Sequence, residues 1–264
     1  IQELEAAYQT RLFDRQGSRI SLTEAGKLLL EHCERILEDY KRLEYEMHLL
    51  HNEYTGGLKL GASTTVAQYV LPPLLASFIG KFPHVNLSLL NGNSREIEAA
   101  LQEHRIDLGF VEGVFRLPNI KYTTFLKDEL VAVVRTGSKL AIGEEITPEE
   151  LLHLPLVLRE RGSGTLDVFE RALQQHNIKL SSLQVLMYLG STESIKLFLE
   201  HTDCLGIVSI RSITRELYSG QLRVVEIKDM PMLRDFSFAQ PQGQESGLAQ
   251  VFMQFAMQDR KSVV

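Results

Sequence analysis

Residues 12–26 read Leu12-Phe13-Asp14-Arg15-Gln16-Gly17-Ser18-Arg19-Ile20-Ser21-Leu22-Thr23-Glu24-Ala25-Gly26. Short apolar runs on both sides of Gln16-Gly17-Ser18 indicate a β-hairpin with a glycine turn. Arg11, Arg15 and Arg19 against Asp14 give this hairpin a local charge of +2, although the whole chain carries −6. A basic hairpin can place arginines along or inside a DNA groove, so these three arginines are the candidate DNA contacts.

The bulk properties are those of a globular protein with room for two or three subdomains. The chain has 264 residues, of which 44% are apolar and 23% charged. Neither Cys33 nor Cys204 has a partner at metal-ligand spacing, so both are expected to be free thiols on buried faces in a reducing cytoplasm. We therefore expect no metal, no cofactor and, without a long apolar run or signal peptide, no membrane. A start at Ile1 indicates a fragment that lacks the first helices of its domain.

The next segment, residues 24–54, is expected to be one long helix. Its apolar residues follow a heptad spacing of four and three, which favours pairing with a second helix over packing against its own domain. Gly56-Gly57 is expected to end the helix and form a hinge. The expected dimerisation residues are Leu29, Ile36, Tyr40, Leu43, Met47 and Leu50.

Beyond residue 57 the pattern alternates between strands and helices, which predicts parallel sheets covered by helices. An internal repeat suggests two similar lobes, because Gly92-x-Ser94-x-x-Ile97 recurs as Gly190-x-Thr192-x-x-Ile195 and Leu108-Gly109 as Leu205-Gly206. The helices are expected at 66–82, 94–104, 148–153, 165–176, 192–202, 212–218 and 245–259. The strands are expected at 58–62, 85–90, 107–111, 120–125, 129–135, 156–159, 183–189, 205–209, 222–226 and 234–239.

Hydroxyl and amide side chains gather at four junctions between a strand and the following helix. Free backbone N–H groups at such junctions attract anions, and ligands of doubly wound sheets bind at the carboxyl ends of strands. Helix capping is the more common role of any single Ser, Thr or Asn there, but four converging loops favour a binding site. The candidate effector contacts are Ser63, Thr64, Thr65, Asn93, Ser94, Glu112, Ser163, Thr165, Ser191 and Ser209.

Charged residues near these loops leave alternatives open. Glu112 would repel an anion, so either it pairs with an arginine or the ligand carries an amino group or a proton there. Arg159 and Arg161 flank the loop at Ser163 and are either cationic partners of the ligand or ordinary surface residues.

Signals for catalysis are missing. The run Gly162-Ser163-Gly164-Thr165 lacks the Gly-Lys ending of a phosphate-binding P-loop, and the segment after Gly61 lacks the second glycine of a nucleophile elbow. His48 and His51 lie three residues apart on the long helix and are expected to face solvent. The sequence therefore does not predict an enzyme.

Taken together, these motifs resemble the LysR-type transcriptional regulators. The resemblance rests on Leu-Phe-x-Arg and Leu-Thr-x-Ala-Gly in the hairpin segment, the linker helix, the Gly-Gly pair, and then Gly-Ala-Ser, Pro72, Gly-Asn-Ser and Asp107-Leu-Gly in this order. It implies an α/β fold in which a winged-helix remnant and a long linker helix precede two Rossmann-like lobes of the type 2 periplasmic-binding-protein kind. It assigns 1–23 to the DNA-binding remnant, 24–57 to the dimerisation helix and hinge, 58–134 with 235–264 to effector-binding lobe I, and 135–234 to lobe II.

The resemblance also implies a function. Members of the family bind promoter DNA as homo-oligomers, dimers or tetramers, and respond to a small effector held between the lobes. Ser63 and Thr65 match the family's first-loop ligand hydroxyls, Ser163 falls near its second-lobe contact, and Arg15 and Arg19 match its phosphate or minor-groove contacts. The chain looks closest to the branch of sulfur-assimilation and carbon-fixation regulators, which implies an anionic effector and a cytoplasmic location.

Two other classes share this bilobal fold. A solute-binding receptor of a transporter should carry a signal peptide and begin directly at the first lobe, whereas this chain begins with a hairpin and a long helix. A deaminase acting on a tetrapyrrole precursor needs a cysteine in a loop to anchor its cofactor, whereas Cys33 and Cys204 fall within predicted elements. The sequence therefore favours the regulator.

Overall fold

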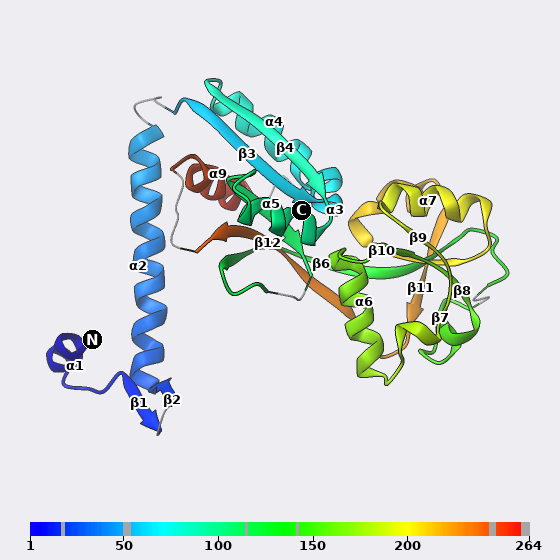
Figure 1. Ribbon diagram of the computed structural model, residues 1–264, viewed down its shortest axis with the longest axis horizontal. Helices are drawn as coiled ribbons and strands as arrows, with labels where there is room; N and C mark the ends of the chain where they lie inside the picture. Colours follow the sequence, from blue (N-terminus) through cyan, green and yellow to red (C-terminus); the bar gives the residue numbers. More distant parts are fainter. Residues whose placement is uncertain (17–18, 50–53, 114–115, 141–142, 243–246, 260–264) are drawn as a thin grey trace. The chain divides into compact units, whose positions relative to one another are not determined.

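The computed structural model describes residues 1–16, 19–49, 54–113, 116–140, 143–242 and 247–259 (Figure 1). The chain divides into two compact units, Ile1–Glu53 and Tyr54–Val264. Among the described residues, no helix is both long and apolar enough to cross a membrane.

The first unit contains the predicted hairpin and long helix. After α1 (Gln2–Tyr8), strands β1 (Phe13–Gln16) and β2 (Arg19–Leu22) pair antiparallel, with Phe13 opposite Leu22. The Thr23 hydroxyl donates to Arg11 O at 2.7 Å and accepts from Gly26 N at 3.0 Å, which joins the hairpin to the start of α2 (Glu24–Leu49). The two paired strands of the hairpin are therefore confirmed, with Arg15 and Arg19 on them, whereas the predicted glycine turn at Gly17-Ser18 lies outside the described residues.

The heptad residues of α2 are mostly exposed in the single chain. Ile36, Tyr40, Leu43 and Met47 are exposed and Leu29 is half-buried, whereas Leu50 lies outside the described residues. Exposed apolar residues at heptad spacing are what a helix of a coiled-coil pair would present. Dimerisation through α2 stays a prediction. Cys33 is exposed, so its expected burial is wrong.

The junction between the units differs from the expectation. Tyr54 is not helical, and its ring lies 5.6 Å from that of Phe82. Gly56 and Gly57 do not end the helix, because they open strand β3 (Gly56–Ser63) and pair with Val85 and Asn86 of the next strand. A hinge at this point stays a prediction. The predicted helix end was wrong because glycine residues can begin a strand as well as end a helix.

The second unit is a mixed sheet with helices packed on it, arranged as two lobes (Figure 1). Eight strands are paired in the order β4-β3-β5-β12-β6-β10-β8-β9, and β11 pairs with β6 and with β7 outside this order. Pairing is parallel within β4-β3-β5 and within β10-β8-β9, as expected, but β6 and β12 run antiparallel to their neighbours.

The first lobe packs its helices around β3, β4 and β5. The returning strand β12 pairs with β5, and the ring of Phe252 in α9 lies 4.8 Å from that of Phe78 and 6.0 Å from that of Phe110, so β12 and α9 pack against this lobe. The expected helix 66–82 breaks at Val70, because Pro72 and Pro73 lack the N–H groups that would continue it. The elements are α3 (Thr64–Tyr69), α4 (Leu71–Lys81), β4 (Val85–Gly92), α5 (Ser94–Gln102), β5 (Leu108–Glu112) and α9 (Gly247–Gln258).

The second lobe follows the predicted order, with the expected helix at 148–153 present as a 3-10 turn. Cys204 is buried there, and burial raises the pKa of its thiol to about 11, so the thiol stays protonated near neutral pH. The elements are β7 (Glu145–Ile146), η1 (Glu150–His153), β8 (Pro155–Arg159), α6 (Gly164–Gln175), η2 (Leu180–Ser182), β9 (Gln184–Leu189), α7 (Thr192–His201), β10 (Leu205–Ser209), η3 (Ile210–Ser212), α8 (Thr214–Tyr218) and β11 (Leu222–Ile227).

The internal repeat corresponds to equivalent packing in the two lobes. A methyl group added to Gly109 of β5 would lie 3.2 Å from Ile97, and one added to Gly206 of β10 would lie 3.0 Å from Ile195. Both isoleucines are fully buried. Each glycine therefore lets the repeated helix, α5 or α7, lie close against its strand.

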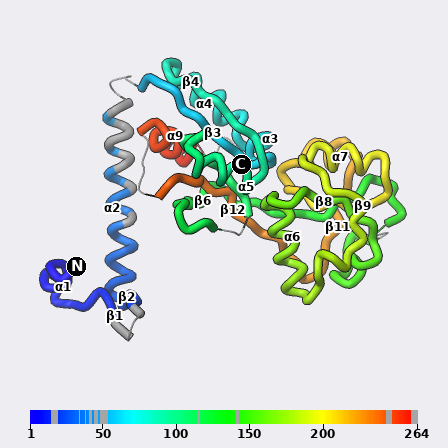
Figure 2. Tube along the Cα trace, in the orientation of Figure 1, coloured from blue at the N-terminus to red at the C-terminus, as the bar shows by residue number. Residues whose placement is uncertain are grey.

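Two long strands connect the lobes: β6 (Ile120–Arg135) runs outward and β12 (Met232–Pro241) runs back (Figure 2). The expected division into strands 120–125 and 129–135 is wrong, because β6 continues through Lys127 and Asp128, which pair with Asp235 and Arg234. The chain crosses between the lobes in these strands. The exact lobe boundaries stay a prediction.

Candidate ligand-binding site

The predicted contact residues lie mostly inside the protein, at the ends of strands that meet between the lobes. Asn93 and Ser191 are half-buried. A buried hydroxyl or carboxylate almost always has a partner, so the partners indicate what each residue does. The buried members are Ser63, Thr64, Thr65, Ser94, Glu112, Ser163, Thr165 and Ser209.

Four of the predicted residues cap helices, the alternative that the sequence left open. Ser63 also occupies a cap position, but its side chain makes no cap hydrogen bond, and its hydroxyl has no hydrogen-bond partner among the described residues. The four caps are Asn93, which accepts from Glu96 N; Ser163, from Leu166 N; Ser191, from Ser194 N; and Ser209, from Arg211 N.

A buried arginine that the sequence reasoning missed organises the centre. Arg234 of β12 donates from Nε to Asp128 Oδ2 at 2.7 Å and from Nη1 to Thr165 Oγ1 at 3.0 Å. Its Nη1 also forms an ion pair with Glu112 Oε2 at 3.0 Å, and Thr65 donates to the other oxygen of Glu112 at 3.3 Å. Glu112 therefore pairs with an arginine, the first of its two alternatives.

Two predicted serines support this buried chain of charges. Ser94 Oγ donates to Glu112 O at 2.8 Å and accepts from Glu112 N at 3.2 Å, while Ser209 Oγ donates to Asp128 Oδ1 at 2.8 Å. Both serine hydroxyls therefore already form hydrogen bonds within the protein. Ser94 and Ser209 therefore hold the charged residues in place.

Gly164, the first residue of α6, lies close against the backbone of Glu112. A methyl group added to Gly164 would lie 2.1 Å from Glu112 O, and backbone cannot move aside as a flexible side chain can. We expect Gly164→Ala to lower the free energy of unfolding by about 1–3 kcal/mol, as overpacking does. Urea denaturation of the variant and of the unchanged protein measures this loss. Gly190→Ala, with no atom within 4 Å, should change little; equal effects would exclude the steric explanation.

A second buried arginine contacts Thr64, the residue that follows the unpartnered Ser63. Arg159 of β8 is 1% exposed, so its interpretation as a surface residue is wrong, whereas Arg161 is exposed. The guanidinium donates to both Glu160 oxygens, at 2.8 and 2.9 Å, and to Thr64 Oγ1 at 3.4 Å. Its Nη1 has no hydrogen-bond partner in the described part of the chain.

A cavity of about 280 Å³ opens next to this arginine. Three predicted residues reach it, each from a different loop: Thr64 after β3, Asn93 after β4 and Ser191 after β9. The loop at Ser163 does not line it. The remaining lining residues are Gln68, Asn91, Gly92, Glu96, Glu160 and Gly190.

Tyr69 and Glu193 join the lobes beside this cavity, a contact that sequence reasoning did not find. The Tyr69 hydroxyl of α3 donates to Glu193 Oε1 of α7, and burial, followed by this hydrogen bond, raises the pKa of Tyr69. Lys196 lies 2.7 Å from Glu193 and 2.8 Å from Glu216. The hydrogen bond between Tyr69 and Glu193 therefore connects α3 of the first lobe with α7 of the second.

The site contains no recognisable metal centre: within the described residues, no group of three or more His, Cys, Asp or Glu side chains could hold a metal ion. The polar groups next to the cavity are hydroxyls, amides, carboxylates and one buried guanidinium. This arrangement can bind and orient a small polar ligand.

Comparison with known proteins identifies related regulators. Residues 51–261 match the family described as the LysR substrate binding domain. An uncharacterized HTH-type transcriptional regulator, YeiE from Escherichia coli K12, is 34% identical over 86% of this chain and 75% of its own length. The RuBisCO operon transcriptional regulator of Acidithiobacillus ferrooxidans is 29% identical over 97% of this chain and 82% of its own. The CcmR regulatory domain of Synechocystis PCC6803, solved in complex with 2-PG, superposes with a TM-score of 0.70, 27% identity, and coverage of 77% of this chain and 97% of that chain.

Proposed function

This chain belongs to the LysR family of transcriptional regulators, and we propose that a small anion bound between its lobes controls how it binds promoter DNA. Regulators, not enzymes or transporter receptors, are the relatives named above. One observation carries the anionic character of the effector: Arg159 is buried beside the cavity, with Nη1 lacking a partner among the described residues.

In this structure Glu160 occupies the position that we assign to the effector's negative charge. Its carboxylate takes two hydrogen bonds from Arg159 and lines the cavity, yet its side chain remains 26% exposed. A half-buried carboxylate can exchange for a ligand anion, because the arginine keeps a charge-assisted partner throughout. The entering anion would also accept from the unpartnered Ser63 hydroxyl and meet the amino-terminal ends of α5 and α7.

The response passes to DNA through the first unit. Binding between the lobes favours one lobe arrangement over others, and in an oligomer joined through the heptad residues of α2 this changes how the paired hairpins present Arg11, Arg15 and Arg19 to DNA. Two hairpins read two half-sites, so their separation selects among promoters. We place this activity in the cytoplasm, where promoter DNA and metabolites are both accessible.

The test is a thermal-shift screen of the whole chain against sulfate, sulfite, thiosulfate, phosphate and 2-PG. A ligand at a hundred times its dissociation constant stabilises the folded state by about 2.7 kcal/mol. We expect a selective stabilisation that Ser63→Glu abolishes, because the added carboxylate repels the anion.

The matched control is Ser181→Glu, which adds the same charge at an exposed serine of the second lobe. It should keep the full response. No stabilisation by any anion, or an undiminished response of Ser63→Glu, would contradict the proposed site.

A further inference from the structure

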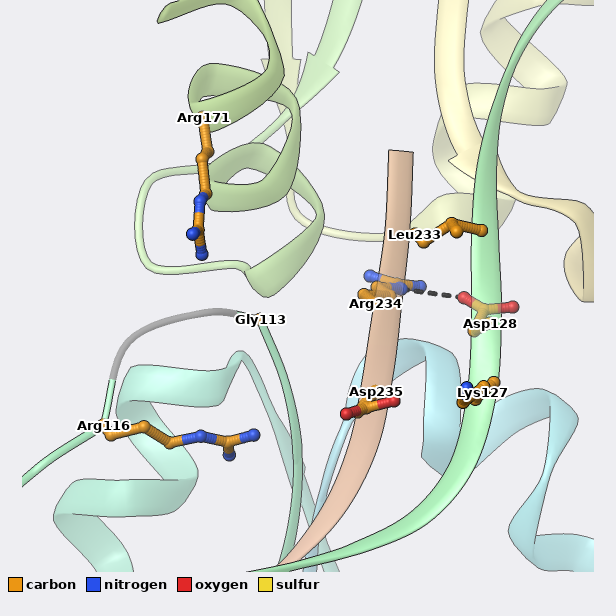
Figure 3. Close-up of a pocket in the computed structure, with 8 residues that line it drawn as sticks. All are labelled: Gly113, Arg116, Lys127, Asp128, Arg171, Leu233, Arg234 and Asp235. Atoms are coloured by element: carbon orange, nitrogen blue, oxygen red, sulfur yellow. Dashed lines mark hydrogen bonds and ion pairs between the residues drawn. The ribbon is translucent and has the colours of Figure 1, made fainter. Parts of the chain in front are cut away.

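A second cavity lies beside the crossover strands and shares no lining residue with the one at Thr64 (Figure 3). Its volume is about 400 Å³, within the range of small-molecule sites. Residues from both lobes and from β6 and β12 line it: Gly113, Arg116, Lys127, Asp128, Arg171, Leu233, Arg234 and Asp235.

Three exposed cations surround this cavity. Arg116, after β5, and Arg171 of α6 extend from different elements toward the space faced by β12, and Lys127 lies on β6 (Figure 3). Arg116 is held in place by Ser237, whose hydroxyl accepts from it at 3.2 Å, and by the Tyr122 ring at 4.4 Å. The side chains of Lys127 and Arg171 have no hydrogen-bond or ion-pair partner among the described residues.

The carboxylates of the cavity do not cancel this charge. Arg234 is paired with both Asp128 and Glu112, and Arg211 lies 3.7 Å from Asp128, so these two arginines and two carboxylates balance one another. Asp235 alone then faces the three exposed cations. The surplus positive charge attracts anions, and Leu233, which is 69% exposed, adds an apolar contact for a carbon skeleton.

We propose that this cavity is a second ligand site, which binds a small organic polyanion with two or three carboxylates. Three cations carried by a loop, a strand and a helix meet a ligand best when its negative groups are separated along a short carbon chain. Such a ligand bridges the lobes, because Arg116 follows β5 of the first lobe and Arg171 belongs to α6 of the second. It contacts the outer side of the pair Arg234–Asp128, whose inner side reaches Glu112.

The test uses citrate and the whole chain, with acetate at the same ionic strength as the singly charged control. We expect citrate, but not acetate, to raise the melting temperature and to give a saturable isotherm by calorimetry. Arg171→Gln and Lys127→Gln should each weaken citrate binding about tenfold, the effect of one lost charge-assisted hydrogen bond. Both residues are exposed, so these substitutions should leave the fold intact.

Two further variants locate the site. Lys179→Gln removes an exposed positive charge from the same lobe outside the cavity and should bind citrate like the unchanged protein. Ser63→Glu changes the residue next to Thr64, which lines the first cavity, and should also retain citrate binding. The proposal is overturned if citrate does not bind, if Lys179→Gln weakens binding as much as Arg171→Gln, or if only Ser63→Glu abolishes it.

Discussion

Replacing Arg234 with methionine is expected to lower the free energy of unfolding by about 3–5 kcal/mol. Methionine fills much of the same volume, but it leaves Glu112 without its cation and Asp128 with Arg211, 3.7 Å away, as its remaining ion-pair partner among the described residues. The side chains of Arg234 and Asp128 are fully buried and that of Glu112 is 1% exposed, so water cannot replace the lost partner. Urea denaturation followed by circular dichroism measures the loss.

A double-mutant cycle separates the charge effect from general damage to the core. In an Asp128→Asn background one of the two carboxylates is already neutral. Arg234→Met should therefore lower the free energy of unfolding by at least about 1 kcal/mol less than it does in the unchanged protein. Lys228→Met, at an exposed position, should change the free energy of unfolding by no more than about 0.5 kcal/mol. Equal costs of Arg234→Met in both backgrounds would show that packing, not charge, explains its effect.

Local patterns were sufficient for most elements of the fold. The hairpin at 13–22 and strand Leu205–Ser209 were predictable because their turn residues and apolar runs are contiguous in the sequence. The equivalent lobes were visible as a repeat because each packs an isoleucine against a strand glycine at the same spacing. These features depend on neighbours along the chain.

The middle of β6 could not be predicted in this way. Lys127-Asp128-Glu129 has the composition of a turn, and Asp128 is buried only because Arg234, 106 residues further along, lies opposite it. Arg159 presents the same difficulty, since it is buried and contacts Thr64 of the other lobe, 95 residues away in the sequence. A buried charge is recognised from its partner, and a single sequence does not say which distant residues meet.

The candidate site was predictable as a set of loops but not atom by atom. The sequence placed Thr64, Asn93 and Ser191 in loops that meet, and all three line the first cavity. The sequence could not distinguish the hydroxyls of Thr65 and Ser94, which form hydrogen bonds within the protein, from that of Ser63, which forms none with the described residues. That distinction depends on side-chain geometry between the lobes.

Two adjacent residues should change effector affinity in opposite directions. Arg159→Gln removes the buried guanidinium that we assign to the anion and should weaken its binding at least tenfold, since a hydrogen bond to a charged group contributes about 1.5–3 kcal/mol. Glu160→Gln removes the carboxylate that now occupies the guanidinium and should strengthen binding, because the ligand no longer competes with a built-in anion. Calorimetric titration with the anion selected by the thermal-shift screen measures both.

A general change in surface charge would also give opposite signs, so exposed control positions are needed to distinguish it from this exchange. Each variant alters the net charge by one unit, yet a nonspecific field would scale with charge alone and would act equally at exposed positions. Glu200→Gln, at an exposed site on α7, should therefore leave the affinity unchanged, as should Arg215→Gln on α8. If Glu160→Gln binds the anion no more tightly than Glu200→Gln does, Glu160 does not compete with the ligand, and Arg159 must meet the anion through Nη1 alone while keeping its present partner.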